Sequence, residues 1–531
     1  MKVAPDAPAR APASTPAAST SGRGSSLSGG RLIVAGIVIA IVAGVALRFV
    51  TRSDLWLDEA LSVNIAKLPL DQLREALRHD GAPPLYYLLL HGWIQVFGSG
   101  DVAVRALSGV FSVATLPIAW WCGQRLGGRR LGWVAVLVFV SSPYAIRYAT
   151  ESRMYSMQMF LVLAGYLALV RALERPALGR LALVAVIASA LMYTQYWSMY
   201  LLAVVGIGLV FRAVRAPTLD ERRAARSVIV AMIAAGITFL PWLTTFQYQL
   251  AHTGTPWGDP ILPTSGFADS IIGFAGGADH SEAFVFLLPI LLLPLLALFG
   301  RAVDNRRVEL DLHTVPGIRW ELAAAVGGLG LGLMAAYAGG TAFEARYAAI
   351  AFPLFALAIA YGTLVFADRR LFVGVVVVVT ILGFGGGARA AYEQRTQASQ
   401  SADYIRAHAR PGDVVVYCPD QLAPDTSRLL AGGPRLTQFT FPSFDSPKFV
   451  DWVDYADRNR RTDPAVFARK TLQRAGRRTI WYVNVEGYRN VIGKCDAVGA
   501  ALAAARPGAV ARVAPDNDLF EFMGLTEYPA R

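Results

Sequence analysis

Two adjacent carboxylates, Asp58 and Glu59, follow the first long apolar run of the chain, which ends at Val50. A run of that length predicts a membrane span, so we expect the pair near a membrane surface. A carboxylate placed there can take a proton from a hydroxyl group as a general base. The alternative is a helix start without catalytic function, with Asp58 as the N-cap and Glu59 in the first turn.

A second polar cluster joins two apolar runs between Ser142 and Ser156. It contains two arginines, one glutamate and three tyrosines: Tyr144, Arg147, Tyr148, Glu151, Arg153 and Tyr155. Charged groups at that depth are costly and typically line a water-filled cavity. Tyrosines and snorkelling arginines at a membrane edge are the alternative, which accounts less well for Glu151. We therefore interpret the cluster as part of a site.

Arg346 and Tyr347 stand at the entry to another apolar run. A guanidinium can fork onto two phosphate oxygens, which suits an anionic lipid head group. A membrane-edge anchor is the alternative for this segment alone.

A further polar pair consists of His79 and Asp80. It follows the segment from Ala60 to Leu77, in which apolar residues recur at helical spacing. This spacing predicts an amphipathic helix along the membrane interface.

The loop 247–282 is rich in Gly and Pro, and it also holds His252, Trp257, Asp259, Asp269, Asp279 and His280. We expect most of these to be turn and solvent residues. A mobile loop that covers a site is the alternative.

A helical membrane protein must position these residues. Of 531 residues, 54% are hydrophobic and 17% are charged, whereas soluble domains carry about 25% charge. Repeated apolar runs predict a polytopic α-helical membrane protein with about 11 transmembrane helices. The predicted spans are 32–50, 101–122, 131–148, 154–171, 180–196, 197–212, 227–246, 283–300, 320–338, 347–366 and 371–388.

Arginine-rich loops decide the orientation. They alternate with loops poor in Lys and Arg, so the positive-inside rule places them in the cytoplasm together with the N-terminus. This holds only if the short run 83–97 does not cross, and we predict that it is an interfacial or partly inserted helix on the outer side. The polar groups described above then share the outer face. Cytoplasmic arginines account for the net charge of +12, so no nucleic-acid partner is expected.

The chain divides into three predicted segments: a disordered cytoplasmic tail over 1–30, a transmembrane catalytic domain over 31–388 whose first outer loop is 51–100, and an extracytoplasmic α/β domain over 389–531. The last segment shows strands at 413–417 and 478–484, and helices near 398–409, 463–475 and 496–505. Cys418 and Cys495 fall in this domain, where they either pair in an oxidising compartment or remain buried free thiols.

A carboxylate and several arginines on one outer face fit group transfer from a lipid-linked phosphate. The carboxylate would deprotonate an acceptor hydroxyl, and the arginines would neutralise the departing phosphate. The sequence has no P-loop, GxSxG, HExxH or DFG signature, so the substrate itself should supply the energy.

Four features in this order resemble the GT-C glycosyltransferase superfamily, and in particular the branch related to protein O-mannosyltransferases and the lipid A aminoarabinose transferase. They are Asp58-Glu59 after the first span, the segment His79–Tyr87, the junction Ser142–Tyr155, and Arg346-Tyr347 at a late span. The resemblance covers about residues 32–390; each motif is weak alone, and the set is fairly specific.

This resemblance implies a GT-C-like fold, a polyprenyl-phosphate sugar donor and extracytoplasmic transfer with inversion. Asp58 would be the catalytic base, and Glu59 would support it or contact the acceptor. His79 and Asp80 would contact substrate, Arg153 and Arg346 would hold the phosphate, and Tyr148, Tyr155 and Tyr347 would surround the head group. Glu151 would orient an arginine or the sugar. No cofactor is required by this pattern, and no metal site is indicated, although some GT-C branches bind a divalent metal.

The leading hypothesis is therefore a multi-pass glycosyltransferase of the inner or plasma membrane, in contact with membrane lipids. Its acceptor is an unknown cell-envelope glycan, lipid or protein. A transporter or flippase of a lipid-linked sugar is the runner-up, but it predicts charges within spans and an inverted repeat. A structural scaffold whose outer domain binds envelope glycans is the third option, which leaves the acidic pair unexplained.

Overall fold

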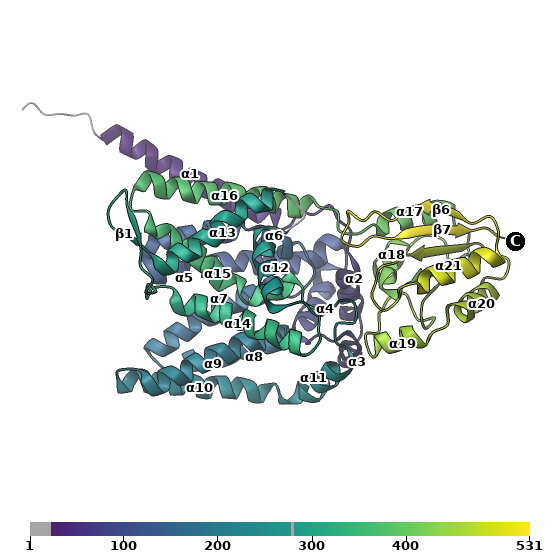
Figure 1. The fold of residues 1–531 in the computed structure, drawn as a ribbon, viewed down its shortest axis with the longest axis horizontal. Helices are drawn as coiled ribbons and strands as arrows, with labels where there is room; N and C mark the ends of the chain where they lie inside the picture. The colour runs from purple at the N-terminus through teal and green to yellow at the C-terminus, as the bar shows by residue number, and fades with distance from the viewer. Residues whose placement is uncertain (1–22, 278–280, 531) are drawn as a thin grey trace, which may run out of the picture.

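Long helices form the first part of the protein in the computed structural model, and a sheet-containing domain lies at one end of the helix bundle (Figure 1). The structure describes residues 23–277 and 281–530. Asp279, His280 and the first 22 residues of the predicted tail lie outside this range. The first helix begins at Arg23, so it includes the last residues that we assigned to the tail.

The bundle helices are α1 (Arg23–Leu47), α5 (Asp101–Ser141), α6 (Pro143–Ala149), α7 (Tyr155–Glu174), α8 (Leu178–Thr194), α9 (Ser198–Arg215), α10 (Leu219–Thr238), α13 (Ser281–Phe299), α14 (Arg319–Ala338), α15 (Phe352–Gly362) and α16 (Arg369–Tyr392). Each predicted span overlaps one of them. The 41-residue α5 contains the span 101–122 and the first part of the span 131–148, which continues into α6, and it breaks at Gly127 and Gly128 between them. Gly128 has a φ of 79°, which glycine adopts without the steric cost of a Cβ atom.

Six helices among the described residues are at least 18 residues long and apolar enough to cross a membrane. The pair formed by α10 and α11 (Leu240–His252), bent by 66°, would add a seventh. Shorter apolar helices include α4 (Leu85–Phe97), α8 and the region of α15. The helical class and the multi-pass membrane character are confirmed, whereas eleven crossings stay a prediction.

The first outer loop differs from the amphipathic helix that we predicted over 60–77. It forms two helices, α2 (Leu57–Ala66) and α3 (Leu70–Asp80), separated around Pro69. Proline lacks the amide proton that a continuing helix needs, which accounts for the break. Most of α2 is buried, because the C-terminal domain packs on it from outside. This helix is therefore enclosed by protein, whereas α3 buries only Leu73 and Leu77.

The C-terminal domain is a five-stranded mixed sheet flanked by helices, with strand order β4-β3-β5-β7-β6. Its strands are β3 (Val414–Cys418), β4 (Thr437–Thr440), β5 (Ile480–Asn484), β6 (Val510–Val513) and β7 (Gly524–Tyr528). The predicted strands are β3 and β5, which pair in parallel. The helices are α17 (Ala398–His408), α18 (Ala423–Leu429), α19 (Tyr455–Arg461), α20 (Pro464–Ala475) and α21 (Lys494–Ala505).

Alternate residues of the buried central strands feed two separate cores, one on each face of the sheet. Val414 and Ile480 point into one core, and Val415 and Trp481 into the other. The period of two in a strand places successive side chains on opposite faces. Cys418 and Cys495 lie in the first core and form a disulfide, so the pairing alternative holds for these two residues.

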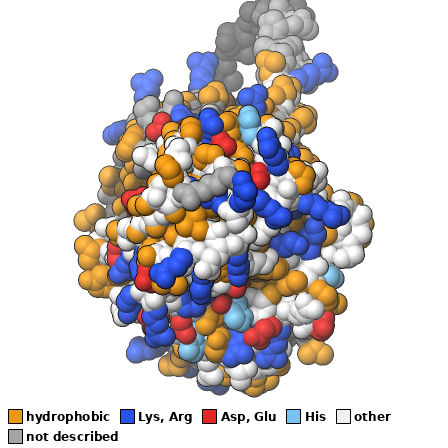
Figure 2. All heavy atoms as spheres, turned by 90° about the vertical axis from the view of Figure 1, so that its right-hand side faces the viewer, with side chains coloured by type: hydrophobic (Ala, Val, Ile, Leu, Met, Phe, Trp, Pro, Cys, Tyr) orange, Lys and Arg blue, Asp and Glu red, His pale blue; other side chains and the backbone are white. Residues whose placement is uncertain are grey.

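Ion pairs and a shared apolar cluster fix this domain to the outer loops of the bundle. Arg428 pairs with Asp101 at 2.8 Å, and Arg489 pairs with Asp259 at 2.8 Å. The arginine-bearing β1–β2 hairpin (Gly300–Ala302 and Val308–Leu310) lies at the opposite end of the bundle (Figure 1). The end of the molecule that carries the C-terminal domain shows many Lys and Arg side chains on its surface (Figure 2).

Candidate active site

Asp58 lies between two arginines that come from distant parts of the chain. Its Oδ2 atom is 3.6 Å from Nη2 of Arg153 and 3.9 Å from Nη1 of Arg346. All three side chains are mostly buried, with 18% of Asp58, 12% of Arg153 and 14% of Arg346 exposed. The predicted meeting of these residues on one face is therefore present in the structure. The N-cap alternative for Asp58 is wrong, because Trp56 occupies that position and Asp58 lies in the first turn.

Arg153 is held by hydroxyl groups from α2 and α4. Its Nη1 atom donates to Oγ of Ser62 at 2.9 Å and to the Tyr87 hydroxyl at 3.3 Å. Ser62 in turn donates to the backbone carbonyl of Asp58 at 2.7 Å. Burial opposes the charge of Arg153, yet nearby Asp58 and the surrounding acidic and phenolic groups raise its pKa well above the ordinary value. Arg153 is thus a fixed cation, and Ser62 contacts both its guanidinium group and the backbone of Asp58.

Arg346 lies among aromatic rings at the start of the 3₁₀ helix η1 (Ala345–Ile350). Its guanidinium carbon is 5.5 Å from the ring centre of Trp56, 5.6 Å from that of Trp257 and 5.8 Å from that of Tyr347. Tyr347 also stacks on Trp197 at 5.4 Å. Aromatic faces attract a guanidinium and fix its plane. The 247–282 loop therefore contributes Trp257 to the surroundings of Arg346.

Several buried donors around Asp58 lack a hydrogen-bond partner within the described parts of the chain. They are Nε of Arg153, Nε of Arg346, the Tyr155 hydroxyl and Nε1 of Trp56. Buried polar groups are nearly always satisfied, so a cluster of exceptions needs an explanation. Charged and neutral donors gathered in this way suit an anionic, oxygen-rich ligand. Tyr148 packs on Tyr155 with ring centres 5.0 Å apart, which places it beside this cluster.

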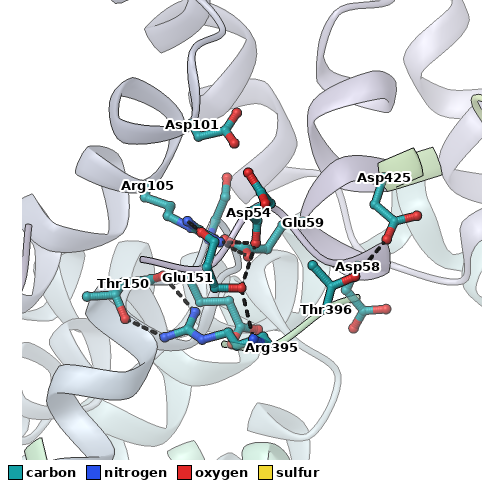
Figure 3. Close-up of polar contacts among 12 residues, drawn as sticks. Asp54, Asp58, Glu59, Asp101, Arg105, Thr150, Glu151, Arg395, Thr396 and Asp425 are labelled. Carbon is teal, nitrogen blue, oxygen red and sulfur yellow. Dashed lines mark hydrogen bonds and ion pairs between the residues drawn. The ribbon is translucent and has the colours of Figure 1, made fainter. Parts of the chain in front are cut away.

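Glu59 has a separate environment from Asp58. Its side chain is fully buried and accepts from Nε of Arg105 at 2.7 Å, from Nη2 of Arg105 at 2.5 Å and from the amide of Ser152 at 2.8 Å (Figure 3). Burial favours the neutral acid, but Arg105 and these hydrogen bonds outweigh it and lower the pKa of Glu59. A supporting role fits this geometry. Direct contact with an acceptor does not fit, because protein groups already occupy both oxygens.

Glu151 is also buried, and its Oε2 atom is 3.2 Å from Nη1 of Arg147. Burial raises the pKa of Glu151, while Arg147 acts in the opposite direction. Its Oε1 atom has no hydrogen-bond partner in the described chain. The expectation that Glu151 orients an arginine is consistent with this contact.

The adjacent His79 and Asp80 point to different neighbours. Asp80 accepts from the Tyr87 hydroxyl at 2.7 Å, and Tyr87 is also a partner of Arg153, so Asp80 belongs to the edge of the site. Burial raises the pKa of Asp80, and Arg153 counteracts this effect. His79 lies 2.8 Å from Asp451 of the C-terminal domain. Its contacts therefore join two domains and do not extend to Asp58.

Sequence reasoning assigned no role to four residues that shape this site, which are Trp56, Ser62, Arg105 and Arg395, and it named Trp257 only as part of the 247–282 loop. Arg105 carried a usable signal, since an arginine inside a predicted span requires a partner. Arg395 is buried and donates to the carbonyl of Thr150 at 2.8 Å and to its hydroxyl at 2.7 Å (Figure 3). Among residues 23–277 and 281–530, no three His, Cys, Asp or Glu side chains gather as a metal-binding group.

Comparison with known proteins relates this architecture to membrane glycosyltransferases. Residues 81–244 match the family described as dolichyl-phosphate-mannose-protein mannosyltransferase. The structure is similar to ArnT from Cupriavidus metallidurans in its apo state, with a TM-score of 0.60 and 10% identity over 95% of this chain and 98% of that one. The same enzyme solved with undecaprenyl phosphate gives a TM-score of 0.57 and 11% identity over 94% and 98%. No curated protein matches this sequence.

At these identities the structural likeness concerns the fold, and it extends over both the bundle and the C-terminal domain. The family match independently covers residues 81–244, which include Tyr148, Arg153 and Tyr155. Together they confirm the resemblance inferred from the motifs: the chain has the fold of the GT-C superfamily of membrane glycosyltransferases.

Proposed function

We propose that the protein is a glycosyltransferase that moves a sugar from a polyprenyl phosphate to an acceptor hydroxyl on the extracytoplasmic side of a membrane. The observation that carries the proposal is the position of Asp58 between Arg153 and Arg346. A single carboxylate can act as a base, and two buried guanidinium groups can bind a phosphate. The three side chains come from α2, the turn before α7 and η1.

In the proposed reaction, Asp58 takes the proton of the acceptor hydroxyl as its oxygen bonds to the anomeric carbon of the sugar. The bond from that carbon to the phosphate oxygen breaks at the opposite face, so the configuration inverts. The electron pair leaves with the polyprenyl phosphate. Arg153 and Arg346 stabilise the developing charge on that phosphate, which is the main electrostatic contribution available to this site.

The remaining residues shape the substrate sites in this proposal. Tyr148, Tyr155 and Tyr347 surround the head group, and their phenolic rings suit the faces and hydroxyls of a sugar. Asp80 lies at the edge, where Tyr87 connects it to Arg153. Glu151 forms an ion pair with Arg147. Glu59 contributes indirectly, because its contact with Arg105 anchors the helix that bears Asp58.

Two features favour an extracytoplasmic site in an inner or plasma membrane. The Cys418–Cys495 disulfide lies in the domain that packs on the site, and disulfides persist in oxidising compartments. The arginine-bearing hairpin at the other end of the bundle agrees with the positive-inside rule. The cytoplasmic N-terminus and the acceptor, whether glycan, lipid or protein, belong to the same proposal.

The protein purified in lipid nanodiscs provides the test. Mass spectrometry of co-purifying lipids should detect a polyprenyl-phosphate sugar, and that donor should lose its sugar when envelope extracts supply an acceptor. Release of polyprenyl phosphate together with a glycosylated product supports the proposal. Movement of the intact donor across sealed proteoliposomes without cleavage would instead establish a transporter.

A further inference from the structure

The helix that carries Asp58 lacks a cap of its own. Its N-cap residue is Trp56, whose indole makes no capping hydrogen bond. The first amide groups of a helix have no partner within the helix and require an acceptor from outside. In α2 the amide of Leu57 is met by Glu521, whose Oε1 and Oε2 atoms lie 3.2 and 3.3 Å away. Glu521 is 464 positions distant in sequence and belongs to the C-terminal domain.

The neighbour of Glu521 contacts the neighbour of Leu57. The ring of Phe520 packs edge-on against Trp56 with centres 5.1 Å apart. Trp56 also presents its ring to Arg346 at 5.5 Å. Two adjacent residues of the C-terminal domain thus hold the two residues that precede Asp58, and one of these touches an arginine of the proposed phosphate site.

A backbone strap holds Glu521 in place. The amide of Glu521 donates to the carbonyl of Arg395 at 2.9 Å, and the amide of Gln397 donates to the carbonyl of Glu521 at 2.9 Å. The amide of Arg395 donates to Oγ of Ser53 at 3.0 Å, while its guanidinium holds Thr150 (Figure 3). Because Ser53 precedes α2 and Thr150 follows α6, these backbone contacts tie Glu521 to the segments around the site.

A second buried carboxyl group accompanies Glu521. Asp425 accepts from the hydroxyl of Thr396 at 3.1 Å and from the amide of Thr426 at 2.7 Å (Figure 3). The side chains of Asp425 and Glu521 hydrogen-bond to one another, which requires a shared proton because two carboxylates only accept. Burial raises the pKa of Asp425 to about 6 and raises that of Glu521 well above its ordinary value.

We propose that Glu521 is a positioning residue for Asp58: its carboxyl group caps α2 and sets the orientation of the first turn, so the C-terminal domain is part of the catalytic assembly. This inference rests on the proposed function, in which Asp58 is the base. Glu521 itself touches the helix and does not touch the reacting atoms. Small displacements of a base relative to its substrate lower turnover strongly.

The test compares substitutions that keep or remove the cap. In Glu521→Gln the amide oxygen can accept from Leu57 and the amide nitrogen can donate to Asp425, so we expect a kcat near wild type. In Glu521→Ala the cap is lost, and we expect kcat to fall roughly ten- to a hundredfold with donor binding almost unchanged. Arg428→Ala is the matched control, because it breaks another contact between the domains, the ion pair with Asp101.

Hydrogen–deuterium exchange gives a readout that does not depend on activity. Amides at the start of α2 should exchange faster in Glu521→Ala than in wild type, and at the wild-type rate in Glu521→Gln and Arg428→Ala. If Glu521→Ala does not yield folded protein, Glu521→Asp replaces it, because its shortened side chain retreats from Leu57.

Wild-type kcat in Glu521→Ala would overturn the inference. So would an equal loss in Arg428→Ala, since any loosening of the domain would then lower turnover. A Glu521→Gln variant as inactive as Glu521→Ala would overturn the assignment of the cap to an acceptor oxygen at position 521. These outcomes all presuppose transfer by the wild-type protein. Absence of transfer by wild type with every donor would refute the proposed function, while the exchange measurement would still report on the cap.

Discussion

Glu59 and Arg105 form a buried two-pronged ion pair, in which Nε and Nη2 of the arginine lie 2.7 and 2.5 Å from the two carboxylate oxygens. Asp58, the preceding residue, reaches its own arginines only at 3.6 and 3.9 Å. Consecutive carboxylates thus have different environments. One is saturated by protein donors, and the other keeps acceptor capacity for a proton.

Breaking the Glu59–Arg105 pair should destabilise the fold. Removal of one partner from a buried ion pair leaves an uncompensated charge and costs about 3–5 kcal/mol. We expect Arg105→Met to lower the thermal unfolding midpoint sharply, as followed by intrinsic fluorescence of the purified protein. The double variant Glu59→Leu/Arg105→Met should recover part of the loss, because no buried charge remains. A double variant less stable than either single one would contradict this account.

Replacement of Asp58 by Asn should abolish base catalysis and leave the fold intact. Removal of a general base typically costs about 10²–10⁴-fold in rate, so transfer should fall by that order, while donor binding stays near wild type. The measurement is single-turnover release of polyprenyl phosphate. Asp71→Asn, at an exposed position of the neighbouring helix α3, is the matched control. Turnover retained by Asp58→Asn would remove Asp58 from the role of base.

Replacement of Arg346 by Ala should act mainly on the donor. Loss of a desolvated hydrogen bond to a charged group costs about 1.5–3 kcal/mol, so the donor Kd should rise by roughly ten- to a hundredfold. Arg346→Lys keeps the charge but loses the planar fork and should lie between. Isothermal titration with the donor in nanodiscs gives the values. Arg52→Ala is the matched control, because it also removes an arginine that lies over an aromatic ring, that of Tyr392. An equal rise of the donor Kd in this control would point to a general effect of lost positive charge.

Much of the architecture was predictable because apolar runs carry their own signal. The buried strands β3 and β5 are continuous apolar segments, and the α5 helix contains two runs divided at Gly127 and Gly128. We grouped Asp58, Arg153 and Arg346 because their loops are predicted to lie on the same side of the membrane. That reasoning predicts a shared face of the protein, but it does not predict which side chains are in contact.

Contacts between distant segments were beyond such reasoning. His79 was expected at the substrate, yet it contacts Asp451, because the sequence does not tell where the C-terminal domain sits. Glu521 was not considered, since nothing local distinguishes a helix cap 464 positions away. In the sequence, Pro69 indicates the break between α2 and α3. Our prediction followed the apolar periodicity instead and continued one helix across this proline.

The buried carboxyl of Asp420 should make the C-terminal domain sensitive to pH. Burial raises its pKa from 3.8 to about 7, although the Tyr455 hydroxyl donates to it at 2.6 Å. The folded state then binds the proton more tightly than the unfolded state, so stability falls as pH rises from about 4 to 7. In Asp420→Asn the amide oxygen still accepts from Tyr455, and this contribution disappears. We therefore expect the variant to unfold at a higher temperature than wild type at pH 8, with the difference shrinking toward pH 5.

The pKa of Asp425 is raised in the same direction in both proteins, so its contribution cancels in the comparison. Asp457→Asn, which removes a surface ion pair, serves as the control. A temperature difference that does not change with pH would show that the Asp420 carboxyl is ionised throughout.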